Sequence, residues 1–105
     1  MITTLQAEFE RASSAYAKAN GITRDRDWFV LKLVEELGEL TQAWNRHEGR
    51  ALRKGRSDAE LTQALADETA DLLGHVLLFA SQNGIDLPAA IERKWRFRPV
   101  EIGGG

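Results

Sequence analysis

A carboxylate lies in the middle of an apolar helical stripe, and this placement limits the folds open to the chain. Residues 57–83 predict one long helix, because large apolar residues recur along one side at helical spacing. These residues are Leu61, Leu65, Leu72, Val76 and Phe79. Glu68 falls within this stripe, and Asp71 falls at its edge. An ionised carboxylate buried without a partner is costly, so it must be paired, protonated or bound to a metal ion.

A second acidic pair, Glu36 and Glu39, has the same spacing in a helix predicted over residues 27–47. The predicted core stripe of this helix comprises Val30, Leu33, Val34, Leu37, Leu40, Thr41 and Trp44. Glu36 borders that stripe, and Glu39 lies ~60° further round the helix. Residues three apart share a helix face, so two adjacent helices can direct all four carboxylates to one point. A single pair is typical of a solvated surface, but two pairs favour a site for a hard cation such as Mg²⁺.

Length and composition indicate one all-α domain spanning residues 1–105. Only 2 of the 105 residues are Pro, and no segment alternates at strand period. Four helices are expected, beginning near Thr3 or Thr4, at Asp25 or Asp27, at the capping box Ser57-Asp-Ala-Glu60, and at Asp86. They form a small four-helix bundle. Residues 72–80 are apolar nearly all round, so we expect a homo-oligomer, either a homodimer or a homotetramer.

The remaining composition bears on location and partners. Cysteine is absent, and no basic segment followed by an apolar core begins the chain, so we expect a cytoplasmic protein without a signal peptide. The longest apolar segment is too short to span a membrane. The net charge of -2 by itself says nothing about partners, but a nucleic-acid-binding domain would normally be more basic, so nucleic acid is not expected as a partner. The C-terminal Gly103–Gly105 is typical of a frayed tail.

Two basic segments flank the acidic pairs in sequence. The first runs from Arg46 to Arg56 and includes Lys54, and the second comprises Arg93, Lys94, Arg96 and Arg98. This combination suits a metal-bridged polyanion such as a triphosphate, although solubilising surface charge is an equal alternative for any one residue.

Four further side chains have more than one interpretation. Glu35 is a candidate base, a partner of Lys32, or a surface residue. His75, one turn after Asp71, either donates a hydrogen bond to a ligating carboxylate or packs in a core or interface. Trp28 is a candidate for stacking on a base, whereas Trp44 is expected in the core.

Four sequence motifs resemble those of the MazG-type nucleotide pyrophosphohydrolases, which belong to the all-α NTP pyrophosphatase superfamily. In order, they are Lys32-Leu-x-Glu-Glu-x-Gly-Glu-Leu, Glu68-x-x-Asp71-Leu-Leu, Asn83-Gly-Ile-Asp86 and Lys94-Trp95. The resemblance covers about residues 27–98. It implies Mg²⁺-dependent hydrolysis of a nucleoside triphosphate, NTP or dNTP, to the monophosphate and pyrophosphate, with Mn²⁺ as an alternative ion.

The resemblance also implies roles for individual residues. Glu36, Glu39, Glu68 and Asp71 match the catalytic metal ligands. Lys94 resembles a basic residue near the phosphates, with Arg96 and Arg98 close by. Glu92 departs from the pattern, because many MazG-type sequences carry Asn there. Lys32, Lys54 and Trp28 complete the predicted substrate-binding set.

Two rival interpretations remain open at this point. A di-iron carboxylate bundle also directs Glu residues inward, but it needs Glu-x-x-His on two helices, and His75 is four residues after Asp71. A non-catalytic helical module for protein interaction or nucleotide binding would instead pair the acids with arginines in buried salt bridges.

Overall fold

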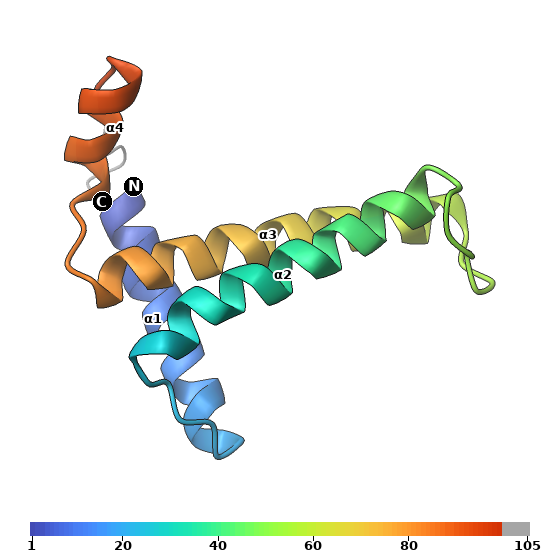
Figure 1. The fold of residues 1–105 in the computed structure, drawn as a ribbon, viewed down its shortest axis with the longest axis horizontal. Helices are drawn as coiled ribbons and strands as arrows, with labels where there is room; N and C mark the ends of the chain where they lie inside the picture. Colours follow the sequence, from blue (N-terminus) through green and yellow to red (C-terminus); the bar gives the residue numbers. More distant parts are fainter. Residues whose placement is uncertain (100–105) are drawn as a thin grey trace.

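The computed structural model describes residues 1–99 and confirms an all-α fold (Figure 1). Its elements are α1 (Ile2–Ala19), α2 (Arg26–His47), α3 (Asp58–Gln82) and α4 (Leu87–Trp95). No strand occurs within residues 1–99. The predicted tail at Gly103–Gly105 lies outside the described residues.

Local side-chain chemistry accounts for three of the helix starts. Asp25 accepts a hydrogen bond from the Trp28 backbone N–H at 2.8 Å and begins α2. Ser57 and Glu60 form the predicted capping box of α3, and Asp86 caps α4. The first helix differs from the prediction: it begins at Ile2, with no side-chain cap. At an exposed helix end, water can satisfy the free N–H groups, so a capping side chain is not required.

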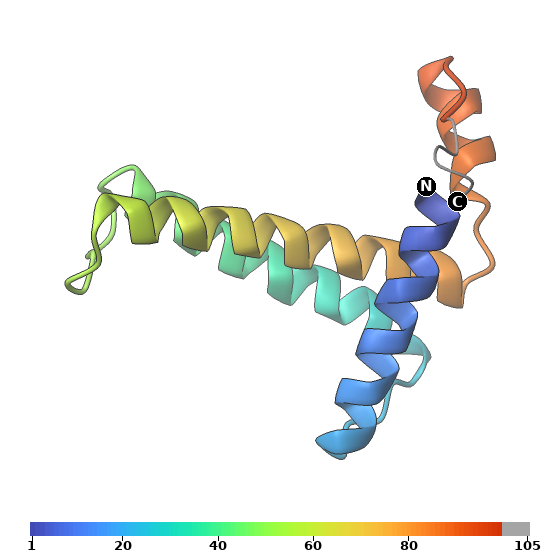
Figure 2. The same cartoon turned by 180° about the vertical axis from the view of Figure 1, so that it is seen from behind.

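The long helices α2 and α3 lie side by side and antiparallel, and α1 crosses one end of this pair (Figures 1 and 2). Gly74 lets α1 approach α3 closely. A Cβ atom at this position would lie 2.5 Å from Phe9 Cε1, well inside van der Waals contact. The Gln6 side chain also donates to the Leu77 carbonyl at 3.3 Å. The α1–α3 crossing therefore depends on a residue without a side chain.

Part of the predicted core of α2 is exposed in the single chain. Phe29, Glu36 and Ala43 are buried against α3, whereas Val34 is 70% exposed and Trp44 is 45% exposed. Val30, Leu37 and Thr41 are exposed as well. The expectation that these five residues lie in the core of one subunit is therefore wrong. The physical reason is geometric. Measured round the helix axis from Glu36, the apolar residues of α2 occupy an arc of more than ~100°, and one neighbouring helix covers only part of that arc.

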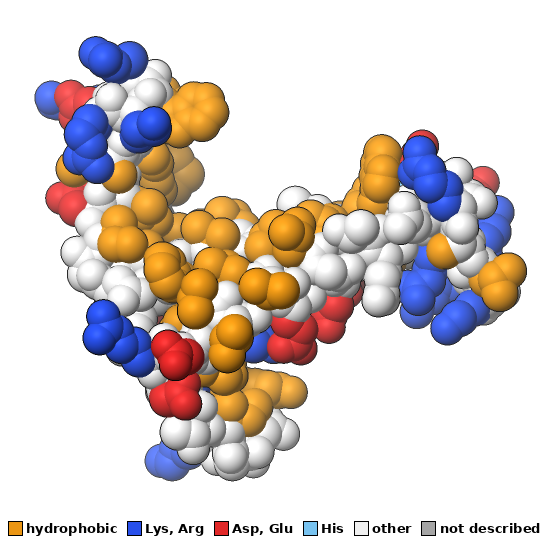
Figure 3. All heavy atoms as spheres, in the orientation of Figure 1, with side chains coloured by type: hydrophobic (Ala, Val, Ile, Leu, Met, Phe, Trp, Pro, Cys, Tyr) orange, Lys and Arg blue, Asp and Glu red, His pale blue; other side chains and the backbone are white. Residues whose placement is uncertain are grey.

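The exposed apolar surface is continuous with α3, where Leu73 and Val76 are exposed. Figure 3 shows apolar side chains gathered over α2 and α3, between α4 and the loop that follows α2. Helix α4 projects from the α2–α3 pair on this side (Figure 1). The radius of gyration is 16.1 Å, compared with about 13 Å for a compact chain of this length. The single chain therefore leaves a broad apolar face uncovered.

Candidate metal centre and adjoining pocket

The packing of α2 against α3 brings together carboxylates that are distant in sequence. Oxygen atoms of Glu36, Glu68 and Asp71 all lie within 4.8 Å of one another. Glu36 also belongs to a second group of the same dimensions, with Glu35 and Glu39. The four acids predicted from sequence are thus contiguous, and Glu36 connects the two groups.

The two most enclosed acids lack hydrogen-bond partners on one oxygen each. Glu36 is only 6% exposed, and Glu68 is half-buried. Oε2 of Glu36 and Oε2 of Glu68 are both buried without a partner. The sequence had suggested that Glu68 would be the more buried of the two. The order is reversed because α3 covers the side of α2 on which Glu36 lies with Phe29 and Ala43.

Burial and mutual repulsion make the ionised forms of both acids unfavourable. Burial, followed by the charge of Glu39, raises the pKa of Glu36, although Lys32 partly offsets this. Burial also raises the pKa of Glu68, with further contributions from Glu39 and Asp71. A hard divalent cation would satisfy the free oxygens and neutralise the repulsion, and it prefers an all-oxygen ligand set. The residues present therefore fit Mg²⁺ or Mn²⁺.

Lys32 and His75 border the carboxylates from opposite helices. The Lys32 ammonium lies 3.3 Å from Glu35 Oε2 and 3.4 Å from Glu36 Oε1. Burial acts against its charge, but hydrogen bonds to Glu35 and Glu36 prevail and raise the pKa of Lys32. Burial, then the charge of Lys32, lowers the pKa of His75. His75 Nε2 lies 3.7 Å from Glu36 Oε1, and its Nδ1 is buried without a partner.

A pocket of about 380 Å³ adjoins the carboxylates. Lys32 and Asp71 line this pocket and also lie at the carboxylate cluster. The other walls come mainly from α1, from the start of α2, and from α3. The lining comprises Phe9, Ala12, Ser13, Tyr16, Ala17, Ile22, Trp28, Lys32, Asp71, Gly74, His75 and Leu78. The centroids of the Trp28 and His75 rings lie 5.9 Å apart. Lys32 Nζ lies 5.9 Å from the centroid of the Trp28 ring.

The α1 contribution to this pocket was not predicted. Phe9 and Tyr16 line the pocket, and helical periodicity in the sequence cannot tell a core contact from a pocket wall. Tyr16 is 65% exposed, which is unusual for a core aromatic residue. The exposed Trp44 is not near this pocket wall; it stacks on His47, with ring centroids 5.8 Å apart.

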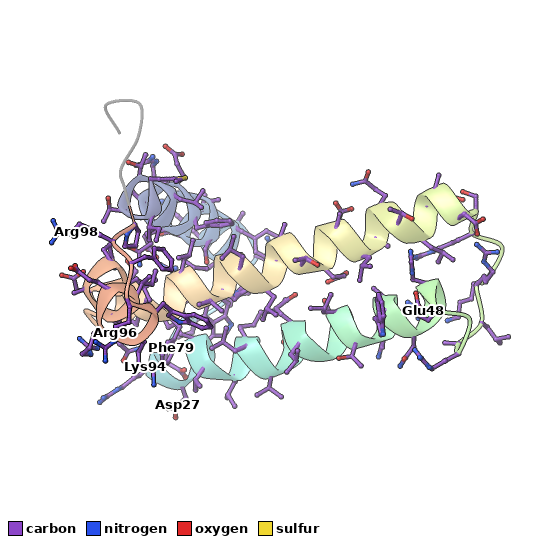
Figure 4. All side chains as sticks on the ribbon, turned by 90° about the horizontal axis from the view of Figure 1, so that it is seen from above. Asp27, Glu48, Phe79, Lys94, Arg96 and Arg98 are labelled. Atoms are coloured by element: carbon purple, nitrogen blue, oxygen red, sulfur yellow. The ribbon has the colours of Figure 1, made fainter. Side chains whose placement is uncertain are left out.

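Three predicted substrate-binding cations do not join the carboxylates within one chain. Lys54 lies in the loop after α2, with a positive φ of 54°. Lys94 and Arg98 lie on and after α4, where Arg98 pairs with Glu92 at 3.2 Å. Figure 4 shows Lys94, Arg96 and Arg98 at one end of the α2–α3 pair and Glu48 at the other. Lys32 is therefore the predicted cation that the fold places beside the acids.

The fold and this site define a class: a small all-α protein with a carboxylate cluster, suited to a divalent metal, beside a pocket of small-molecule size. A model of the phosphoribosyl-ATP pyrophosphohydrolase family matches residues 2–94, and the chain belongs to this family. The family is all-α and related to the MazG-type enzymes, so the predicted relationship is confirmed. No curated protein and no solved structure matches the chain.

Family membership indicates an activity of the pyrophosphohydrolase type. Enzymes of this kind commonly use divalent metal ions, in agreement with the acidic cluster. A nucleotide substrate is consistent with the family. No helix among the described residues is long and apolar enough to cross a membrane.

Proposed function

We propose that the protein is a Mg²⁺-dependent pyrophosphohydrolase that converts an NTP or dNTP and water to the nucleoside monophosphate and pyrophosphate. The observation that carries this proposal is the pair of buried, unpartnered oxygens, Oε2 of Glu36 and Oε2 of Glu68. Two free carboxylate oxygens at the contact of two helices are unfavourable in a purely structural role. Family membership supports the reaction class.

In this proposal Glu36, Glu39, Glu68 and Asp71 hold Mg²⁺, or Mn²⁺ in its place. The bound metal would supply neutralisation of the phosphate charge and a water of lowered pKa. Water oxygen forms a bond to the α-phosphorus, and the bond from that phosphorus to the α–β bridging oxygen breaks. Pyrophosphate departs with that oxygen, and the proton of the attacking water passes to a base. We propose that Glu35 and His75, which lie beside the cluster, assist this step or orient the ligating carboxylates.

Lys32 is proposed to contact the triphosphate, because its ammonium lies beside Glu36 and lines the adjoining pocket. Trp28 lines the same pocket and is proposed to contact the nucleoside. Lys54, Lys94 and Arg98 lie at the ends of the α2–α3 pair. We propose that they reach a triphosphate only from a second copy in a homodimer or homotetramer. The uncovered apolar face of α2 and α3 supports such an assembly.

A second candidate substrate is phosphoribosyl-ATP, which the description of the matching family favours. The bond broken would be the same, because this molecule is also a nucleoside triphosphate. Neither candidate requires nucleic acid or a membrane as a partner, and we propose a cytoplasmic location.

The decisive experiment measures the products from a panel of canonical and modified NTPs and dNTPs and from phosphoribosyl-ATP, with Mg²⁺. Pyrophosphate and orthophosphate are assayed separately. We expect pyrophosphate from at least one substrate, no reaction with EDTA, and, in heavy-oxygen water, the label in the monophosphate. Asp67→Asn serves as a matched control for a substitution at Glu68. Asp67 lies next to Glu68 on α3, but its carboxylate accepts a hydrogen bond from Gln63. Orthophosphate as the sole product would place the attack at another phosphorus and refute the assignment.

A further inference from the structure

The pocket beside the carboxylates has walls suited to a flat, apolar ring. Phe9 and Tyr16 from α1 and Trp28 from α2 provide aromatic surface, and Leu78 from α3 adds apolar surface. Its volume of about 380 Å³ lies near the lower end of the range for small-molecule pockets, roughly 300–1,000 Å³. Gly74 and Phe9 set one boundary, because any side chain at position 74 would push the Phe9 ring out of place. The pocket is therefore small and mostly apolar.

The position of the pocket relates it to the triphosphate. Asp71 belongs both to the carboxylate group and to the pocket lining. Lys32 also does both, since its ammonium lies 3.4 Å from Glu36 Oε1 and it lines the pocket. A nucleotide with its phosphates at the carboxylates would thus place its base or sugar in this pocket.

Within one chain, the charges around the pocket do not suit a second phosphate group. Among the described residues that line it, Lys32 is the only lysine or arginine, and Glu35 and Glu36 already pair with it. Arg24, just beyond Ile22, is held by Glu10 at 2.7 and 2.9 Å. A phosphate needs several charge-assisted donors to offset the loss of hydration, and here it would also meet the Asp71 carboxylate.

We infer that this pocket binds the nucleobase of the substrate by stacking and shape, and that it selects an uncharged, unsubstituted base over one carrying a phosphoribosyl group. The inference rests on the proposed function and refines its substrate class. It places Tyr16 and Trp28 in base binding, and it predicts that phosphoribosyl-ATP is the poorer substrate despite its identical triphosphate.

The first test compares kcat/KM for phosphoribosyl-ATP with that for the best unmodified triphosphate of the panel, using the full-length protein and Mg²⁺. We expect the unmodified substrate to be favoured at least tenfold. An equal or higher value for phosphoribosyl-ATP overturns the inference while leaving the pyrophosphohydrolase proposal intact. Absence of pyrophosphate from every substrate would instead refute the proposed function.

The second test separates the base from the phosphates. Tyr16→Ala removes an exposed aromatic wall, and Trp95→Ala on α4 is the control, because Trp95 is 74% exposed and outside the pocket. Loss of base stacking should raise KM for the nucleotide about tenfold in Tyr16→Ala. Inorganic tripolyphosphate has no base. Its inhibition constant should therefore change less than about twofold, because the variant loses only contacts to the base.

The outcomes of the second test are distinct. An unchanged KM in Tyr16→Ala, or a parallel rise in KM and in the tripolyphosphate inhibition constant, overturns the inference. Where no triphosphate is hydrolysed, binding of α,β-methylene-ATP followed by tryptophan fluorescence replaces KM. Weaker binding in Tyr16→Ala but not in Trp95→Ala then supports the pocket assignment, and equal binding in all three proteins refutes it.

Discussion

Replacing Glu68 by Gln removes one negative charge from the carboxylate cluster while keeping the size of the side chain. In the metal-free protein, Glu68 lies near Glu36 and Asp71, with oxygen atoms within 4.8 Å of one another. Its Oε2 has no hydrogen-bond partner, and burial raises its pKa. The wild-type protein therefore contains repulsion that the variant lacks.

The size of this repulsion follows from the separation. Two unit charges 4.8 Å apart interact by about 0.9 kcal/mol in water and by about 3.5 kcal/mol at an effective dielectric constant of 20. Asp71 is exposed, so solvent screens part of this interaction. We expect Glu68→Gln to raise the free energy of unfolding without metal by roughly 1–2 kcal/mol at pH 8. For a domain of this size, that change corresponds to a rise in Tm of about 5–10 °C.

Thermal unfolding of wild type and Glu68→Gln, each with EDTA and with Mg²⁺, measures this effect. Mg²⁺ should stabilise the wild type by binding the folded state, and it should stabilise the variant less because one oxygen ligand is lost. Hydrolysis should be abolished in the variant. If Glu68 were a structural salt-bridge partner, the same change would instead cost about 3–5 kcal/mol. A large fall in Tm with the Mg²⁺ response retained would refute the metal-site assignment.

Two further predictions concern pH and assembly. Because the pKa values of Glu36 and Glu68 are raised, the folded metal-free protein binds more protons than the unfolded chain above the ordinary value of 4.5. Their contribution to the free energy of unfolding should thus fall as pH rises through the raised values, and denaturant titrations of Glu68→Gln should show a smaller fall than wild type. Sedimentation should detect a dimer or larger assembly that Val34→Glu disrupts and that Leu52→Glu, in the exposed loop, does not. A concentration-independent wild-type monomer would contradict this prediction.

Much of the local structure could be predicted because it depends on residues close in sequence. The capping side chains Asp25, Ser57 and Asp86 act on backbone groups within three residues, so their positions mark the helix starts in sequence and in structure. The i, i+3 spacing likewise places the two acids of each pair on one helix face. The candidate metal ligands were therefore identified without knowledge of the packing.

Tertiary packing decided what the helix faces contact. The apolar residues of α2 mark a face that avoids water, but their pattern does not distinguish a partner helix in the same chain from one in a second copy. The predicted intrachain core was consequently wrong for Val30, Val34, Leu37, Thr41 and Trp44. Helical periodicity also gave no sign that α1, by crossing α3 at Gly74, would add Phe9 and Tyr16 to a pocket beside the acids. Spacing along one helix determines which residues share a face, whereas burial of Glu36 and the walls of the pocket depend on how separate helices pack, which involves contacts between residues far apart in sequence.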